Sequence, residues 1–274
     1  MLYQFAKYQA LGNDMLVIDP ATFSLPLTPA RARLLCHRHF GLGADGICYG
    51  PLPETAAPNA MRFINPDGTE AEKSGNGLRI FARYLWDVGL VNGRSYPITI
   101  HGQTIRADVL DDAARTIALA MGQLTFSRLE EDVVVGGEMV KVTAVSIGNP
   151  HCVLFTDDLD AIQTIGPQLE TAHLFPNRTN VQLVRVVDTH TIEIAIWERG
   201  AGYTLASGTS ASAAAGTAVR TGRCQSPVAV RMAGGVATVA VDEAWQVVLT
   251  GGVTAVAQGT IAPDLLKELE DLVG

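Results

Sequence analysis

The sequence predicts an α+β protein of two similar domains, each a mostly antiparallel sheet curled around one central helix. First, short segments rich in β-branched residues fill much of the chain, at 98–100, 116–121, 140–148, 191–198 and 236–242. Second, helical patterns are few, at 29–38, 159–170, 263–274 and after Ser74 and Ser207. Third, two parts of the chain resemble each other. Long runs of strands around two central helices are typical of an α+β fold.

The internal repeat is carried by two short motifs. A Leu or Ile, a Gly and an Asn precede an apolar strand at 11–13 and again at 147–149. Ser74 opens a helix-like run that stops at Gly89, and Ser207 opens one that stops at Gly222. A glycine 15 residues after each serine is the pattern of a helix that ends at a C-terminal glycine. The repeat therefore predicts two domains of one architecture.

The boundary between the domains is expected near residues 114–124. We assign 1–118 to an N-terminal repeat domain and 119–259 to a C-terminal one, with segment 260–274 docking on the first. That segment is expected to be a docked closing helix, because one apolar stripe contains Leu265, Leu266, Leu269, Leu272 and Val273.

Composition narrows the classes of partner. Of the 274 residues, 47% are hydrophobic and 18% are charged, which is enough apolar material for a sizeable core. The formal net charge of −8 and the lack of a basic stripe argue against nucleic acid. The sequence contains no stretch of about 18 apolar residues, so we expect no membrane span. Polar residues interrupt the opening segment too early for it to be a signal peptide. We expect a cytoplasmic protein, and the sequence leaves a homodimer open.

The cysteines predict neither a metal site nor disulfides. Cys36, Cys48, Cys152 and Cys224 lack zinc-ligand spacing and lie in apolar segments. Free buried thiols in a reducing compartment are the expected state.

The two serine-led helix starts predict a binding site. Such a helix has a hydroxyl and several unpaired backbone N–H groups at its N-terminus, which favours an anion such as a carboxylate. Gly75 and Gly208 would let a ligand approach the backbone closely. Two such helix starts would clamp one small anionic ligand. A single serine is better explained as an ordinary N-cap, whereas for the matched pair the two explanations are balanced.

Six segments in order resemble the cofactor-independent diaminopimelate epimerase family: LGNDMLVID, HFGLGADGI, RFINPDGTEAEKSGNG, IGNPHCVLF, FPNRTNVQLV and WERGAGYTLASGTS. The resemblance covers nearly the whole chain. It implies two pseudo-symmetric domains with the site in the cleft between them. It also implies an isomerase of amino acids in lysine biosynthesis that uses neither pyridoxal phosphate nor a metal. In the family, one cysteine thiolate removes the α-proton and the opposite thiol delivers one from the other face.

The resemblance also implies a set of ligand residues. Those expected at the far, non-reacting amino-acid end of the substrate are Asn13, Asn65, Asn149, Asn180, Glu198 and Arg199. Those expected around the reacting carboxylate are Gly75, Asn76, Gly208 and Thr209. Arg199 suits a carboxylate independently of the resemblance, because a guanidinium binds it through two parallel hydrogen bonds.

The chain departs from the family where the chemistry takes place. Ser74 and Ser207 stand at the two catalytic cysteine positions, Tyr203 replaces a usual glutamate, and Ser210 replaces a glycine. A thiol titrates near 8.5 and a hydroxyl near 15.7, so forming the base costs on the order of 10 kcal/mol more with serine. A serine pair should be a very poor two-base catalyst on an ordinary α-proton.

Three explanations follow from the serine pair. In the first explanation, the cysteines of an epimerase were replaced by serines and the enzyme was thereby inactivated. This explanation does not account for Tyr203, Ser210 and Lys73. Alternatively, the chain is a divergent enzyme with altered proton chemistry, either an isomerase or a dehydratase or tautomerase on the same scaffold. Its further acid–base candidates are Lys73, His151, Glu198 and Tyr203, although a solvated lysine and a loop-ordering histidine are the plain alternatives. In the third explanation the protein binds an amino acid and catalyses nothing.

Overall fold

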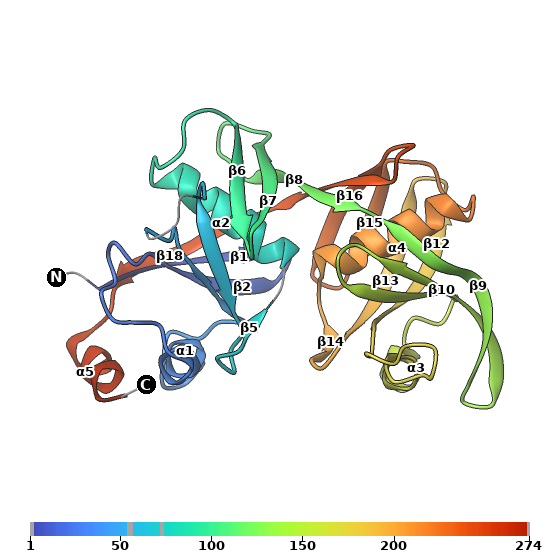
Figure 1. Cartoon of the computed structure of the whole chain (residues 1–274), viewed down its shortest axis with the longest axis horizontal. Helices are drawn as coiled ribbons and strands as arrows, with labels where there is room; N and C mark the ends of the chain where they lie inside the picture. The colour runs from blue at the N-terminus through green and yellow to red at the C-terminus, as the bar shows by residue number, and fades with distance from the viewer. Residues whose placement is uncertain (1–2, 54–56, 72–73, 273–274) are drawn as a thin grey trace. The chain divides into compact units, whose positions relative to one another are not determined.

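The computed structural model describes residues 3–53, 57–71 and 74–272. The chain forms two compact units (Figure 1). Unit 1 contains residues 1–119 and 252–274, and unit 2 contains residues 120–251. The C-terminal segment from Gly252 onward thus belongs to the same unit as the N-terminal part of the chain.

The described residues of unit 1 form one curled sheet and three helices. Its strands are β1 (Gln4–Ala10), β2 (Asn13–Ile18), β3 (Ile47–Tyr49), β4 (Ala60–Ile64), β5 (Glu70–Ala71), β6 (Ser95–Ile100), β7 (Gln103–Val109), β8 (Thr116–Gln123), which continues into unit 2, and β18 (Thr254–Thr260). Its helices are α1 (Pro29–Cys36), α2 (Gly75–Asp87) and α5 (Pro263–Asp271).

Unit 2 repeats this composition with one helix fewer. Its strands are β9 (Thr125–Val135), β10 (Glu138–Ser146), β11 (Pro150–Phe155), β12 (Asn180–Asp188), β13 (Thr191–Glu198), β14 (Gly202–Thr204), β15 (Val228–Met232), β16 (Gly235–Val241) and β17 (Gln246–Gly252). Its helices are α3 (Ile162–Glu170) and α4 (Gly208–Arg220). Each of the five sequence-predicted strand segments overlaps an observed strand, but the segments 140–148 and 236–242 extend past the C-terminal ends of β10 and β16.

Strand pairing confirms the internal repeat. In unit 1, β1–β2 is antiparallel, β2–β3 parallel, β3–β4 antiparallel, β4–β6 parallel and β6–β7 antiparallel. In unit 2, β10–β11, β11–β12, β12–β13, β13–β15 and β15–β16 follow the same order of directions. Helix α2 follows the short strand β5, and α4 follows the short strand β14. Ser74 and Ser207 therefore occupy topologically equivalent positions.

Each sheet is wrapped around one of these two helices (Figure 1). Helix α2 packs against β1, β2, β3 and β7, and α4 packs against strands from β10 to β16. The α4 sequence suits this surrounding, because Ala213, Ala214 and Ala215 are completely buried and let strands approach on every side. Gly89 and Gly222 follow the helix ends with φ angles of 70° and 71°, as the predicted C-terminal glycines require.

Helix α5 closes the apolar core of unit 1. Leu269 is completely buried in a cluster with Leu16, Phe23 and Leu35, and Leu265 and Leu266 pack against the same cluster. Arg31 of α1 donates from Nε to the Leu269 carbonyl oxygen over 2.7 Å. The predicted stripe thus faces a core, although Val273 lies outside the described residues. No helix in the described part of the chain has the length and apolarity needed to cross a membrane.

Helix α3 packs so closely on β13 that a glycine is required at the contact. A β-carbon at Gly166 would lie 2.8 Å from both Cβ and Cγ of Trp197. The Trp197 ring cannot move freely, because its Nε1 donates to Glu170 over 2.8 Å. We predict that Gly166→Ala lowers the free energy of unfolding by about 1–3 kcal/mol, despite the higher helix propensity of alanine.

Urea unfolding followed by tryptophan fluorescence measures this change. Gln163→Ala on the same helix is the control, because Gln163 is exposed and its truncation leaves the contact intact. A Gly166→Ala protein as stable as the Gln163→Ala protein would contradict the packing argument.

Candidate active site

Ser74 caps helix α2. Its φ and ψ angles of −131° and 114° are extended, and its Oγ accepts from the Gly77 backbone N–H over 3.0 Å. The first turn, with Gly75 and Asn76, is buried. The hydroxyl therefore satisfies one of the helix N–H groups that would otherwise lack a partner. Ordinary capping is thus one real role of Ser74.

Ser207 begins helix α4 but its side chain does not cap it. Its φ and ψ angles of −144° and 126° are again extended, and it is buried, as are Gly208 and Thr209. Its Oγ lies 3.4 Å from Thr209 Oγ1. Burial raises the pKa of Glu198, and the Ser207 side chain opposes this shift. The two serines thus share a place in the topology but differ in their partners.

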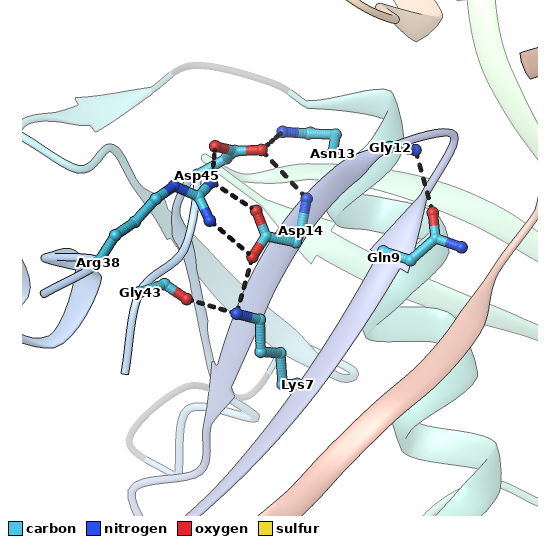
Figure 2. Close-up of polar contacts among 8 residues, drawn as sticks. All are labelled: Lys7, Gln9, Gly12, Asn13, Asp14, Arg38, Gly43 and Asp45. Atoms are coloured by element: carbon cyan, nitrogen blue, oxygen red, sulfur yellow. Dashed lines mark hydrogen bonds and ion pairs between the residues drawn. The ribbon is translucent and has the colours of Figure 1, made fainter. Parts of the chain in front are cut away.

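Asn13 and Asn76 form one hydrogen-bonded group in unit 1. Asn13 follows a tight turn between β1 and β2, in which Leu11 and Gly12 have φ angles of 54° and 81°. Asn76 Nδ2 donates to Asn13 Oδ1 over 3.2 Å. Asn13 Nδ2 in turn donates to Asp45 Oδ2 over 3.0 Å (Figure 2). The helix α2 N-terminus and the β1–β2 turn are therefore directly linked.

Asn65 lies in the turn between β4 and β5. Its Nδ2 donates to Thr69 Oγ1 over 3.0 Å, and its backbone N–H donates to the Thr69 carbonyl over 2.8 Å. These bonds describe a turn-forming asparagine.

Three predicted ligand residues of unit 2 lie at neighbouring strand ends. Asn180 opens β12 opposite His151 of β11, and its Nδ2 donates to the Pro150 carbonyl over 2.9 Å. Its Oδ1 accepts from the Arg199 backbone N–H over 3.0 Å, just after the end of β13. Strand pairing thus brings Asn180 and Arg199 together with Asn149, which precedes β11.

The turn that carries Glu198 and Arg199 is anchored by Glu170, which the sequence analysis missed. The Glu170 carboxylate is buried and accepts from the Gly200 N–H and the Trp197 Nε1–H, each over 2.8 Å. Arg178 pairs with it over 2.6 Å. In the described part of the chain, the half-buried Arg199 side chain takes part in no such ion pair.

His151 is completely buried beside Asn149. The ring Nε2 lies 3.0 Å from Asn149 Oδ1. Burial lowers the pKa of His151 to about 3, the Gln182 side chain works in the opposite direction, and the positive charge of Arg199 lowers it further. The ring is therefore neutral near pH 7, and Nε2–H donates to Asn149. This geometry favours His151 as a residue that orders Asn149 over an acid–base role.

The remaining predicted positions are Lys73, Tyr203 and Ser210. Lys73 lies outside the described residues. Tyr203 is 44% exposed and lines a surface cavity of about 390 Å³ in unit 2, together with Glu193 and Arg231. Ser210 is completely buried, and its Oγ accepts from Gln182 Nε2 over 3.0 Å. Its hydroxyl thus completes a buried polar pair, a role that its place after Thr209 did not reveal.

Native thiols are poor replacements for the two missing ones. All four cysteines are free and buried. Cys48 is the one beside the α2 N-terminus, where its Sγ donates to the Gly77 carbonyl over 3.4 Å, and burial raises its pKa. Burial likewise raises the pKa values of Cys36 and Cys152. A thiol with a raised pKa stays protonated and is a weak base. Within the described residues, no group of three or more His, Cys, Asp or Glu is arranged to hold a metal ion.

The buried His151 predicts a pH dependence of stability. In the unfolded chain its pKa returns to about 6.5, so the unfolded state binds more protons between about pH 3 and 6.5. The His151 contribution to stability is therefore complete above about pH 6.5 and is lost as the pH falls toward 3. We predict that the melting temperature of the His151→Gln protein depends less on pH over this range than that of the wild type.

Thermal melts at half-unit steps of pH measure the slope. His173→Gln, at an exposed position, is the matched control and should keep the wild-type slope. Equal slopes for the His151→Gln and wild-type proteins would contradict the assignment of a buried neutral ring.

Comparisons with known proteins agree with this fold. The sequence model of the diaminopimelate epimerase family matches residues 5–127 and 143–256. Diaminopimelate epimerase 2 of Nostoc sp. is 46% identical, over 96% of this chain and 96% of its own. A Bacillus anthracis phenazine biosynthesis protein of the PhzF family has the same fold, with a TM-score of 0.75 at 14% identity, covering 96% of this chain and 99% of its own. A probable proline racemase from Agrobacterium radiobacter K84 gives 0.70 at 14% identity, covering 95% and 93%.

The expected fold class is thereby confirmed, and the Nostoc relative matches 96% of the chain. The chain belongs to the diaminopimelate epimerase family and is an epimerase-like isomerase.

Proposed function

We propose that this protein acts at the α-carbon of an amino acid or related carboxylate, with Ser74 and Ser207 serving opposite faces of that carbon. The observation that carries the proposal is the topological equivalence of the two serines, each at the N-terminus of the helix inside its sheet. Each helix start presents backbone N–H groups of a buried Gly-containing turn, which favours the reacting carboxylate.

The distal end of the ligand is assigned to polar side chains at strand ends and turns. In unit 2, Arg199 supplies a half-buried guanidinium without an ion pair in the described part of the chain, held next to Asn180. In unit 1, Asn13 supplies an amide at the β1–β2 turn. Together they suit a ligand with a second carboxylate, such as diaminopimelate. No metal or organic cofactor is part of the proposal.

The proton chemistry of the serine pair differs from that of a thiol pair. Ser207 influences Glu198, whose pKa is raised by burial, whereas the Ser74 hydroxyl is used in capping. Forming the base from a serine hydroxyl costs on the order of 10 kcal/mol more than forming it from a thiol. This observation favours a second candidate, a dehydratase or tautomerase on the same scaffold whose substrate proton is more acidic.

Restoring the thiols tests whether the scaffold retains a two-base site. We predict that Ser74→Cys with Ser207→Cys raises α-proton exchange on meso-diaminopimelate by several orders of magnitude, because a thiol is far easier to ionise. Each single change should do much less, since epimerisation needs a proton removed on one face and delivered on the other. Deuterium incorporation in heavy water, followed by NMR, measures the exchange.

The double Ser→Ala protein is the control for exchange that needs neither side chain. A double-cysteine protein that binds diaminopimelate and stays inert would refute the two-base site. Ligand uptake by calorimetry without exchange in any variant would identify a binding protein. Turnover of another substrate by the wild type, lost in the double-cysteine protein, would identify the second candidate.

A further inference from the structure

Four side chains of unit 1 form a continuous hydrogen-bonded chain that includes two predicted ligand residues. Arg79 Nη2 donates to Asn76 Oδ1 over 2.6 Å. Asn76 Nδ2 donates to Asn13 Oδ1 over 3.2 Å, and Asn13 Nδ2 donates to Asp45 Oδ2 over 3.0 Å. Every donor points the same way, from a cation at one end to an anion at the other.

This direction decides the orientation of both amides. A guanidinium has only donors and a carboxylate only acceptors, so Asn76 must turn its oxygen toward Arg79 and Asn13 must turn its nitrogen toward Asp45. With either amide reversed, two donors or two acceptors would face each other. Hydrogen bonds in such a row also polarise one another.

The cationic end is completely buried. Arg79 has no exposed surface, and its Nε and Nη1 atoms have no hydrogen-bond partner in the described part of the chain. Burial lowers its pKa to about 10, so it remains charged near pH 7. An interior charge is costly, and among the described residues its one hydrogen bond goes to Asn76. The cation therefore acts through Asn76.

The anionic end of this row of hydrogen bonds is held by residues that are not part of the row. Asp45 pairs with Arg38 over 2.6 Å and accepts from the Asp14 backbone N–H over 3.1 Å. Asp14 is bound in turn by Arg38 and Lys7, over 2.7 and 2.8 Å. Figure 2 shows the Asp45 carboxylate between the Arg38 guanidinium and the Asn13 amide. Burial opposes ionisation of Asp14, but Arg38 and Lys7 outweigh it and lower its pKa to about 2.

We propose that Arg79 and Asp45 are positioning residues that lock the Asn13 and Asn76 amides in one orientation for the ligand. The lock holds Asn13 with its nitrogen toward Asp45, so the second Nδ2–H is the donor that remains for a carboxylate. The role in ligand binding rests on the proposed function, whereas the locked amides are a property of the protein without ligand.

The test separates the acceptor at position 45 from its ion pairs. Asp45→Ala removes the acceptor, Asp45→Asn retains a carbonyl oxygen that can accept from Asn13, and Asp14→Asn weakens the pairs with Lys7 and Arg38 but leaves Asn13 untouched. Calorimetry measures the Kd for meso-diaminopimelate. We expect a rise of about tenfold or more for Asp45→Ala and Arg79→Met, and less than about threefold for Asp45→Asn and Asp14→Asn.

A second readout needs no ligand. The side-chain amide resonances of Asn13 and Asn76, in protein labelled with ¹⁵N at asparagine, should move in Asp45→Ala and Arg79→Met and stay near wild type in Asp14→Asn. If Asp45→Ala does not fold, Arg79→Met at the other end of the row of hydrogen bonds makes the same comparison.

The outcomes distinguish the locked orientation of the two amides from its role in ligand binding. Unmoved amide resonances in both Asp45→Ala and Arg79→Met would overturn the lock. Moved resonances with an unchanged Kd would overturn its role in binding. A wild-type protein that takes up no diaminopimelate, with the resonances moved as expected, would refute the proposed ligand while leaving the lock in place.

Discussion

The structure depends on burying a whole helix inside a curled sheet, twice. Strands must approach the helix from several sides, so its surface has to be apolar or small nearly all round, as in the completely buried run of three alanines in α4. The same arrangement buries the first helical turn, whose N–H groups have no partner within the helix. Because water cannot reach these buried N–H groups, a capping side chain or a ligand must accept their hydrogen bonds. The carboxylate binding proposed at Gly75 and Gly208 would meet a need that arises from the way the core is built.

The two halves solve this shared problem differently. In α2 the Ser74 hydroxyl satisfies a backbone N–H directly, and Asn76, two residues later, hydrogen-bonds with Asn13 and Arg79. In α4 the Ser207 side chain makes no cap and lies next to the Thr209 hydroxyl instead. A duplicated architecture therefore produces two chemically different helix starts.

Two carboxylates organise turns beside the helix starts, the buried Glu170 and the more exposed Asp45. Glu170 holds the turn after β13 through backbone and indole N–H groups, and Asp45 holds the turn after β1 through Asn13 and Asp14. A carboxylate stabilises such a turn because its hydrogen bonds are directional and charge-assisted. His151 does for Asn149 what Asp45 does for Asn13, with a neutral ring in place of a carboxylate. Rigid turns of this kind are what a site for a small flexible ligand needs.

Periodicity, turn residues and the repeated motifs determined the fold class, the five helices and the equivalence of Ser74 and Ser207, because these are local properties of the chain. The place of Asn65 in a turn also follows from its neighbours, Asp67 and Gly68. The partners of the polar side chains were beyond reach. Arg79 reads as one charge in an apolar helix and Asp45 as one residue of a Gly-rich loop, yet strand pairing and helix packing bring them to either end of one chain of bonds. The burial that makes His151 neutral and raises the pKa of Glu198 was likewise decided only by the tertiary structure, since desolvation depends on every neighbour in space and on none in particular along the sequence.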